Sequence, residues 1–245
     1  MKLIILFFIL HSGFLFANNS KAPLQMAVYL PEAPPYLFID DNSGQLIGIV
    51  AEVLNRFSQH HNIDINYLYL NRIRAESSIY NGVADISYLA PDWVEHPDKL
   101  LFSKYIYQSN DRLYSLSSEL IQLEQKQIKD KVVCAREFYR HPIFEQYIEQ
   151  HQLKRMDTDS SEGQLKMMLS GRCDFIYTNE WIAKHLIKNI KTNKKIYASE
   201  KAFDLNRGAL AFNKKRHHEF MLFNQFIHEL HKSGDIDKII DMYIK

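Results

Sequence analysis

The chain has 245 residues, of which 46% are hydrophobic, enough for one large domain or two of ordinary size with a sizeable core. Its 30 Lys and Arg nearly balance its 29 Asp and Glu, so the formal net charge is +1. This neutral balance argues against a nucleic-acid-binding surface and against a polybasic membrane patch.

Residues 1–17 predict a secretory signal peptide. Lys2 is followed by an unbroken apolar run from Leu3 to Leu10, and the small residue Ala17 precedes the polar NNSK. The alternative is a membrane anchor, but a span needs roughly 20 apolar residues and residues 11–13 interrupt this run. We therefore expect cleavage after Ala17 and a periplasmic location.

The first half of the mature chain alternates strands and helices. LQMAVYLP predicts a strand, and the stiff Pro34-Pro35 loop after it would direct Tyr36 outward, at the sheet edge where open α/β sheets bind ligands. An amphipathic helix is expected at 49–60, the strand INYLYL after it, a helix from Arg74 to Asn81, and the strand ADISYLA. This alternation predicts a mostly parallel sheet.

The segment RIRAESSIYNGVADISY contains spacing that recurs later in the chain. Gly82, Asp85 and Tyr88 are repeated as Gly171, Asp174 and Tyr177 in MLSGRCDFIY. Glycine favours a position just past a helix end, and apolar residues after each Asp suit a buried strand. The repeat indicates two lobes of similar construction, although helix–glycine–strand junctions are common in α/β proteins.

At the start of the second half, the alternation of strands and helices stops. LLFSKYIYQS and DRLYSLSS are extended and have no helix between them, as a crossing between lobes would require. The sequence then predicts a strand in QIKDKVVCA, a helix starting near Pro142 and the strand LKRMD. It further predicts a helix capped by Asp159 with Glu162, the strand CDFIY and a helix from 181 to 189. RGALAFN leads to a long amphipathic helix closed by Gly234, and then to a last helix.

Cys134 and Cys173 are the only two cysteines. An even pair in an exported chain makes a disulfide plausible if their strands are neighbours in one sheet. The alternative is two buried free thiols.

The whole mature chain carries, in this order, PPYLFIDDNSGQLIGIVAEVLNRF, IYNGVADISY, LLFSKYIY, IKDKVV, MLSGRCDFIY and HKSGDIDKIIDMYIK. This order resembles the family 3 periplasmic solute-binding proteins, typified by the polar amino-acid receptors of ABC importers. The resemblance implies a two-lobed α/β periplasmic-binding-protein fold of type II, with mostly parallel sheets flanked by helices and two crossing strands as hinge. We expect a signal peptide at 1–17, lobe 1 at 23–112, lobe 2 at 113–205, and a return to lobe 1 at 206–245.

The candidate site departs from the amino-acid receptors that the chain resembles. Those receptors typically carry Thr-x-x-Arg after the first Gly-x-x-Asp strand, whereas here Pro97 falls near the Arg position. They also place an Asp beyond the second such strand, where this chain has Asn179. Because both charge partners of a zwitterion are missing, a standard amino acid is expected to bind poorly.

Two arginines at the start of a helix offer a substitute. Arg74 matches a divergent branch of the family with the pattern Arg-Ala-x-x-x-Leu-x-x-Gly-x-x-Asp, here RAESSIYNGVAD, and Arg72 falls near the aromatic position of the amino-acid receptors. An arginine facing the cleft would bind a carboxylate or phosphate bidentately. The alternative is a solvated or structural arginine. Three aromatic residues are candidates for the walls of the cleft, namely Tyr36, Trp93 and Tyr139. Arg136 and Asn179 could supply polar contacts from lobe 2, and Glu32 could bind a cationic group.

The leading hypothesis is a monomeric, non-catalytic extracytoplasmic protein that needs no cofactor. It would capture a small polar solute, expected to bear a carboxylate, for the membrane subunits of an ABC-type importer or for a sensor. One alternative is an enzyme, because the fold that the chain resembles hosts a dehydratase for cyclic dienyl acids. Such chemistry would need a general acid or base, for which Glu32, Asp92 and Glu180 are available.

A metal-binding role is the other alternative, because the chain has 11 His. Pairs such as His60-His61, His217-His218, and His228 with His231 invite it, as does DWVEHPD. Polar histidines on a helix surface are ordinarily solvated, so we predict no metal site.

Overall fold

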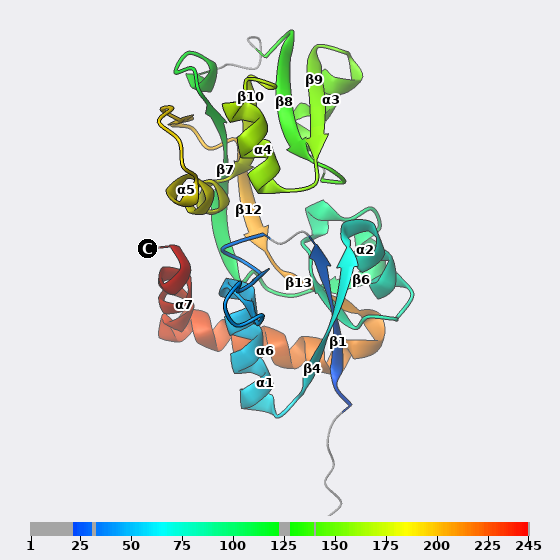
Figure 1. Ribbon diagram of the computed structural model, residues 1–245. Coiled ribbons are helices and arrows are strands. Elements are labelled where there is room, and N and C mark those ends of the chain that lie inside the picture. The colour runs from blue at the N-terminus through cyan, green and yellow to red at the C-terminus, as the bar shows by residue number, and fades with distance from the viewer. Residues whose placement is uncertain (1–21, 31–32, 123–127, 140, 245) are drawn as a thin grey trace, which may run out of the picture.

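The computed structural model describes residues 22–30, 33–122, 128–139 and 141–244. They form two α/β units, which we call lobe 1 and lobe 2, each built on its own sheet (Figure 1). The predicted α/β class is confirmed. Within the described residues no helix is both long enough and apolar enough to cross a membrane.

Lobe 1 contains a five-stranded sheet in the order β4-β1-β5-β13-β6. The strands are β1 Leu24–Leu30, β4 Ile65–Asn71, β5 Ile86–Tyr88, β6 Leu100–Phe102 and β13 Leu210–Asn213. The helices are α1 Ile49–His61, α2 Arg72–Tyr80, α6 His217–Ser233 and α7 Asp235–Ile244, and a small hairpin joins β2 Phe38–Ile39 to β3 Leu46–Ile47. The apolar stripe predicted on α1 is buried, with Val53, Leu54 and Phe57 at most 1% exposed.

Lobe 2 contains the sheet β11-β7-β10-β8-β9, with β12 also paired to β7. The strands are β7 Tyr107–Ser115, β8 Lys131–Arg136, β9 Leu153–Thr158, β10 Phe175–Asn179, β11 Tyr197–Ala198 and β12 Asp204–Gly208. The helices are α3 Pro142–Glu149, α4 Ser161–Leu169 and α5 Glu180–Asn189. A disulfide joins Cys134 in β8 to Cys173 just before β10, with an S–S distance of 2.07 Å.

Both sheets are mixed, whereas the sequence predicted mostly parallel sheets. Strands linked through a helix run parallel, as β1 does with β4 and β8 does with β9. Strands that arrive from the other lobe pair antiparallel, as β13 does with β5 and β7 does with β10. In the two large sheets, these antiparallel pairs therefore involve the strands that enter a lobe from the other one.

The crossing is made by β7 and β12, which pair antiparallel from Tyr107 opposite Gly208 to Asp111 opposite Asp204. Figure 1 shows these two strands extending from lobe 1 toward lobe 2. The lobe boundaries expected at 112/113 and 205/206 fall inside β7 and β12.

The repeated Gly-x-x-Asp spacing has a structural role in each lobe. The Asp85 carboxylate accepts a hydrogen bond from the backbone N–H of Gln25 at 2.8 Å, and Asp174 accepts one from the backbone N–H of Val132 at 2.7 Å. Each aspartate thereby ties the turn before its own strand to the neighbouring strand. Asp85 also forms an ion pair with Arg216 at 2.7 Å.

Two helix starts differ from the sequence prediction. α2 begins at Arg72 rather than Arg74, because the Asn71 side chain accepts from the backbone N–H of Arg74 and caps the helix there. α4 is capped by Ser160 rather than Asp159, and the Ser160 hydroxyl accepts from the backbone N–H of Gly163. In both cases a neighbouring polar residue supplies the cap.

Candidate functional site

A cavity of about 90 Å³ lies between the lobes. Its walls come from the ends of β1 and β5, the start of α2, the crossing strands β7 and β12, and the loop after β8. Seven of its 14 described lining residues are Tyr, Trp or Phe. The described lining is Tyr29, Ala33, Tyr36, Arg72, Tyr88, Trp93, Tyr107, Asp111, Phe138, Tyr139, His141, Asn179, Ile182 and Asn206. The site is therefore a largely aromatic chamber that is partly open to solvent, as the exposed ring of Phe138 in its lining shows, and that contains few charged groups.

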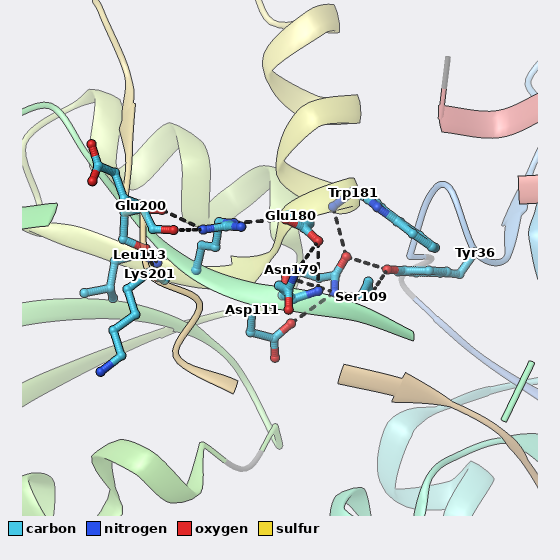
Figure 2. Close-up of polar contacts among 12 residues, drawn as sticks. Tyr36, Ser109, Asp111, Leu113, Asn179, Glu180, Trp181, Glu200 and Lys201 are labelled. Atoms are coloured by element: carbon cyan, nitrogen blue, oxygen red, sulfur yellow. Dashed lines mark hydrogen bonds and ion pairs between the residues drawn. The ribbon is translucent and has the colours of Figure 1, made fainter. Parts of the chain in front are cut away.

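Tyr36 links the two lobes across this cavity. Its ring stacks on Tyr107 with centroids 4.5 Å apart, and its hydroxyl donates to Asn179 Oδ1 and lies 3.2 Å from the Ser109 hydroxyl (Figure 2). The loop that presents Tyr36 packs closely against Gly48, because a Cβ there would lie 2.5 Å from the Tyr36 carbonyl oxygen. The sequence predicted that the Pro-Pro loop would direct Tyr36 outward, whereas its side chain is 2% exposed and lies in the wall of the cavity.

Asn179 is the polar centre of the contact between lobes. Its Oδ1 accepts from the backbone N–H of Trp181 at 3.0 Å and so caps α5. Its Nδ2 donates to Ser109 Oγ at 2.7 Å and to Asp111 Oδ1 at 3.1 Å (Figure 2). The residue is 4% exposed, and its amide holds neighbouring side chains in place at the wall of the cavity.

Asp111 places a carboxylate in the wall of the cavity. It accepts from Asn179 Nδ2 and, at 3.4 Å, from Asn206 Nδ2. Burial raises the pKa of Asp111 from its ordinary value to about 6, more than these hydrogen bonds lower it, and the carboxylates of Asp204 and Glu180 raise it further. No sequence signal singles out Asp111, because it lies in a segment that predicts only an extended strand.

Arg72 lines the cavity, whereas Arg74 does not. The Arg72 guanidinium pairs with Glu76 at 2.7 Å, donates to the Trp93 carbonyl oxygen, and lies 5.6 Å from the centre of the Tyr29 ring. Arg74 is exposed on α2. The hypothesis that Arg74 binds a ligand carboxylate in the cleft therefore lacks support from this geometry.

The remaining candidates are divided between the cavity and its surroundings. Trp93 and Tyr139 both line the cavity. Arg136 is 5% exposed and lies behind the wall, with its guanidinium 4.5 Å from the centre of the Tyr139 ring and a hydrogen bond of 3.3 Å to the Asp159 carbonyl. Glu32 lies outside the described residues.

His141 is a further lining residue that sequence reasoning missed. Burial and the nearby Arg155 charge lower the pKa of His141 to about 3, so its ring is neutral at physiological pH. The histidines considered for metal binding lie elsewhere: His60 and His61 pack on Phe226, and His231 contacts the Tyr105 carbonyl. In the part of the chain that the structure describes, no group of three or more His, Cys, Asp or Glu is placed to hold a metal ion.

The comparisons with known proteins agree with this architecture. Residues 26–245 match the family described as bacterial extracellular solute-binding proteins, family 3. No curated protein sequence matches the chain.

Solved structures share the fold at low sequence identity. An amino acid ABC transporter substrate-binding protein from Streptococcus pneumoniae, bound to L-arginine, is 19% identical with a TM-score of 0.74, covering 91% of this chain and 94% of that one. A histidine kinase sensor domain with similarity to periplasmic binding proteins is 15% identical with a TM-score of 0.76, covering 92% and 97%. An ancestral amino acid-binding protein described as a precursor of cyclohexadienyl dehydratase is 16% identical with a TM-score of 0.73, covering 91% and 96%.

Proposed function

Because the chain belongs to the bacterial extracellular solute-binding proteins of family 3, we propose that it captures a small polar solute in the cavity between its lobes. The observation that carries this proposal is the aromatic chamber itself, with walls from both lobes. The Tyr36 hydroxyl of lobe 1 bonds to Asn179 and Ser109 of lobe 2 at its edge. Opening these contacts would admit a solute, and closing them would trap it.

The proposed ligand contacts are Tyr36, Arg72, Trp93, Tyr139 and Asn179 from the sequence candidates, with Asp111 added. Ligand-binding clefts commonly combine an apolar and aromatic lining with a few placed polar groups, and this cavity has that composition. Two crossing strands are a suitable hinge because a small change in their twist rotates one sheet relative to the other.

The protein would act outside the cytoplasm, after removal of residues 1–17. It would hand its solute to the membrane subunits of an ABC-type importer, as the solute-binding proteins it resembles do. Presentation of the solute to a sensor is the second candidate, favoured by the likeness to a histidine kinase sensor domain. Both roles need the same capture step.

We propose binding without catalysis. Glu180, one of the acids considered for an enzyme, pairs with Arg112 at 2.9 Å and accepts from the side chain of Asn110, and it does not line the cavity. A carboxylate held in this way stabilises the β7–α5 junction and is poorly placed for proton transfer to a bound solute.

The capture step can be tested with the two tryptophans of the chain, both of which lie at the cleft. Trp93 lines the cavity, and Trp181 packs on Tyr36 and Tyr107 at 5.9 and 5.3 Å between ring centres. Titration with amino acids, amines, organic acids and sugars should give a saturable fluorescence change for one class. The same class should raise the unfolding temperature, since a ligand at a hundred times its Kd stabilises by about 2.7 kcal/mol.

A blocking variant shows whether the response comes from the cavity. Ala33 is a small lining residue, so Ala33→Leu should fill the chamber and abolish the fluorescence change. The matched control is Ala198→Leu at an exposed position of β11, which should respond normally. If no solute class binds, or if binding survives Ala33→Leu in a folded protein, the proposed function is wrong.

A further inference from the structure

The charges around the cavity do not cancel. Arg72 and Asp111 are the charged side chains in its lining, and the Arg72 charge is offset by Glu76 in an ion pair that is largely shielded from solvent. Asp111 receives only neutral amide donors from Asn179 and Asn206, and no described residue forms an ion pair with it. His141 adds no charge because its ring is neutral. One negative charge therefore remains without a counter-ion in this part of the chain.

Unsatisfied polar atoms lie around the same carboxylate. His141 Nε2, Tyr177 Oη and Asn206 Oδ1 are buried, and none has a hydrogen-bond partner among the described residues. All three residues line a second cavity that adjoins the first and shares Asp111 with it, and the rings of His141 and Tyr177 are 5.4 Å apart. Because buried polar atoms are normally paired, this cluster indicates a place for a polar ligand group.

The cluster is rich in acceptors. The Asn206 amide nitrogen already donates to Asp111, which leaves its oxygen as the unpaired atom. The Asp111 carboxylate is charged at neutral pH, and a hydroxyl or a neutral imidazole can also accept. A group that brings several N–H donors and a positive charge would satisfy these atoms, whereas a carboxylate would face Asp111 with the same sign of charge.

The aromatic chamber beside this cluster suits the rest of such a ligand. Cations are attracted to the faces of Tyr, Trp and Phe rings, and half of the lining residues carry one. The chamber of about 90 Å³ is smaller than the roughly 150 Å³ apolar cavity that accommodates benzene, so a short apolar body fits it.

The second cavity adds negative charge outside the chamber. Among the described residues, its lining carries Asp92, Glu95, Asp111 and Asp204 against one cation, Arg207. Like charges along a cleft raise the local concentration of opposite charges and speed their association. A cation would therefore be drawn toward Asp111.

From these four observations we infer that the cavity binds a small organic ammonium ion, with its charged head at Asp111, Asn206 and Tyr177 and its short apolar body among the aromatic rings. The inference rests on the solute-binding function proposed above and specifies its ligand class. It replaces the carboxylate-bearing solute expected from Arg74, which is exposed outside the cavity.

Three four-carbon probes of matched shape test the charge preference. Butylammonium, 1-butanol and butyrate are titrated into the purified protein at about pH 8, where an aspartate of pKa about 6 is ionised, with calorimetry and tryptophan fluorescence as readouts. Butylammonium should bind at least about tenfold more tightly than the other two, which corresponds to about 1.4 kcal/mol. Equal affinity of the three probes, or tighter binding of butyrate, would overturn the inference.

Two variants test the residues. Asp111→Asn should weaken butylammonium by about tenfold or more and leave 1-butanol within about twofold. Tyr177→Phe removes only an unpaired hydroxyl, so the protein should keep its stability while butylammonium weakens severalfold. The matched control, Asp237→Asn, removes the same charge from an exposed position of α7 and should change neither affinity. Unchanged butylammonium affinity in both site variants would refute the assignment.

Failure of this inference is distinguishable from failure of the proposed function. If an amino acid, sugar or organic acid binds in a manner abolished by Ala33→Leu while butylammonium does not bind, the capture function holds and the ammonium assignment is wrong. If no solute of the wider panel binds either, the proposed function fails together with it.

Discussion

Replacing Asp111 by Asn should stabilise the unliganded protein at high pH, because the carboxylate is held in the cavity at an energetic cost. Burial raises the pKa of Asp111 to about 6 from an ordinary value of 3.8. A difference of about 2 units corresponds to about 3 kcal/mol, at 1.36 kcal/mol per unit. This figure is an upper value, since the side chain keeps some contact with solvent. Asn retains the shape but offers a single acceptor, so one hydrogen bond worth about 1 kcal/mol is lost. The net gain should be about 2 kcal/mol.

The sign of the pH dependence follows from the raised pKa. Above about pH 6 the carboxylate is ionised in both the folded and the unfolded chain, so the full cost of the buried charge is present. Well below pH 4 the carboxyl is protonated in both states and the cost disappears. The advantage of Asp111→Asn should therefore be full at pH 8, fall between pH 6 and pH 4, and be nearly gone at pH 4.

Urea unfolding followed by tryptophan fluorescence at these three pH values measures the difference between the two proteins. Titrating groups distant from Asp111 are common to both chains and cancel in the comparison, whereas the neighbouring carboxylates of Asp204 and Glu180 interact with Asp111 and belong to the measured difference. A variant that is less stable than the natural protein at pH 8, or a difference that does not change with pH, would refute the reasoning. It would mean that Asp111 is stabilised in its ionised form by groups other than those described above.

Three further predictions concern the framework of the site. Removing the disulfide with Cys134→Ala and Cys173→Ala should cost about 4 kcal/mol of unfolding free energy, given the sequence separation of 39; a loss below about 1 kcal/mol in urea unfolding would contradict this. Gly48→Ala should destabilise the protein by more than about 2 kcal/mol, because its Cβ would overlap the Tyr36 carbonyl. The control Gly44→Ala has open space around it and should cost about 1 kcal/mol of backbone strain. Equal losses in thermal unfolding would argue against a close approach at Gly48. Tyr36→Phe removes the hydroxyl that bonds to lobe 2, so small-angle scattering should show a larger radius of gyration, and an unchanged radius would mean that this contact does not hold the lobes together.

The elements that sequence predicted well are those whose signal is local. Val53, Leu54 and Phe57 repeat at helical spacing, and all are buried on α1. Gly82 and Gly171 both adopt positive φ, 73° and 77°, just after a helix, as the repeated Gly-x-x-Asp spacing predicted. Local sequence determines such features because neighbouring residues alone decide the backbone conformation.

The position of Arg72 and Arg74 shows how a small error in a helix start changes a site. Two residues along a helix correspond to a rotation of about 200°, so the two side chains face nearly opposite directions. The cap at Asn71 fixes which of them is turned inward, and it buries Arg72 and exposes Arg74. The sequence prediction named both residues but began the helix at Arg74.

Asp111 could not be located from sequence because its environment comes from distant strands. It lies opposite Asn179 in β10 and opposite Asp204 in β12, residues 68 and 93 positions further along the chain. No local pattern in DRLYSLSS indicates that pairing. The carboxylate reaches the cavity wall only after β7 has paired on both sides.

The crossing strands have a consequence for how this protein can diversify. Tyr107 and Asp111 on β7 and Asn206 on β12 belong both to the connection between the lobes and to the wall of the cavity. A substitution that alters the preferred solute at these positions also alters the strands about which the lobes would turn. If a whole lobe were exchanged between related proteins, only part of the residues that contact the solute would be transferred with it. Selection for a new solute must therefore act on recognition and mechanics together.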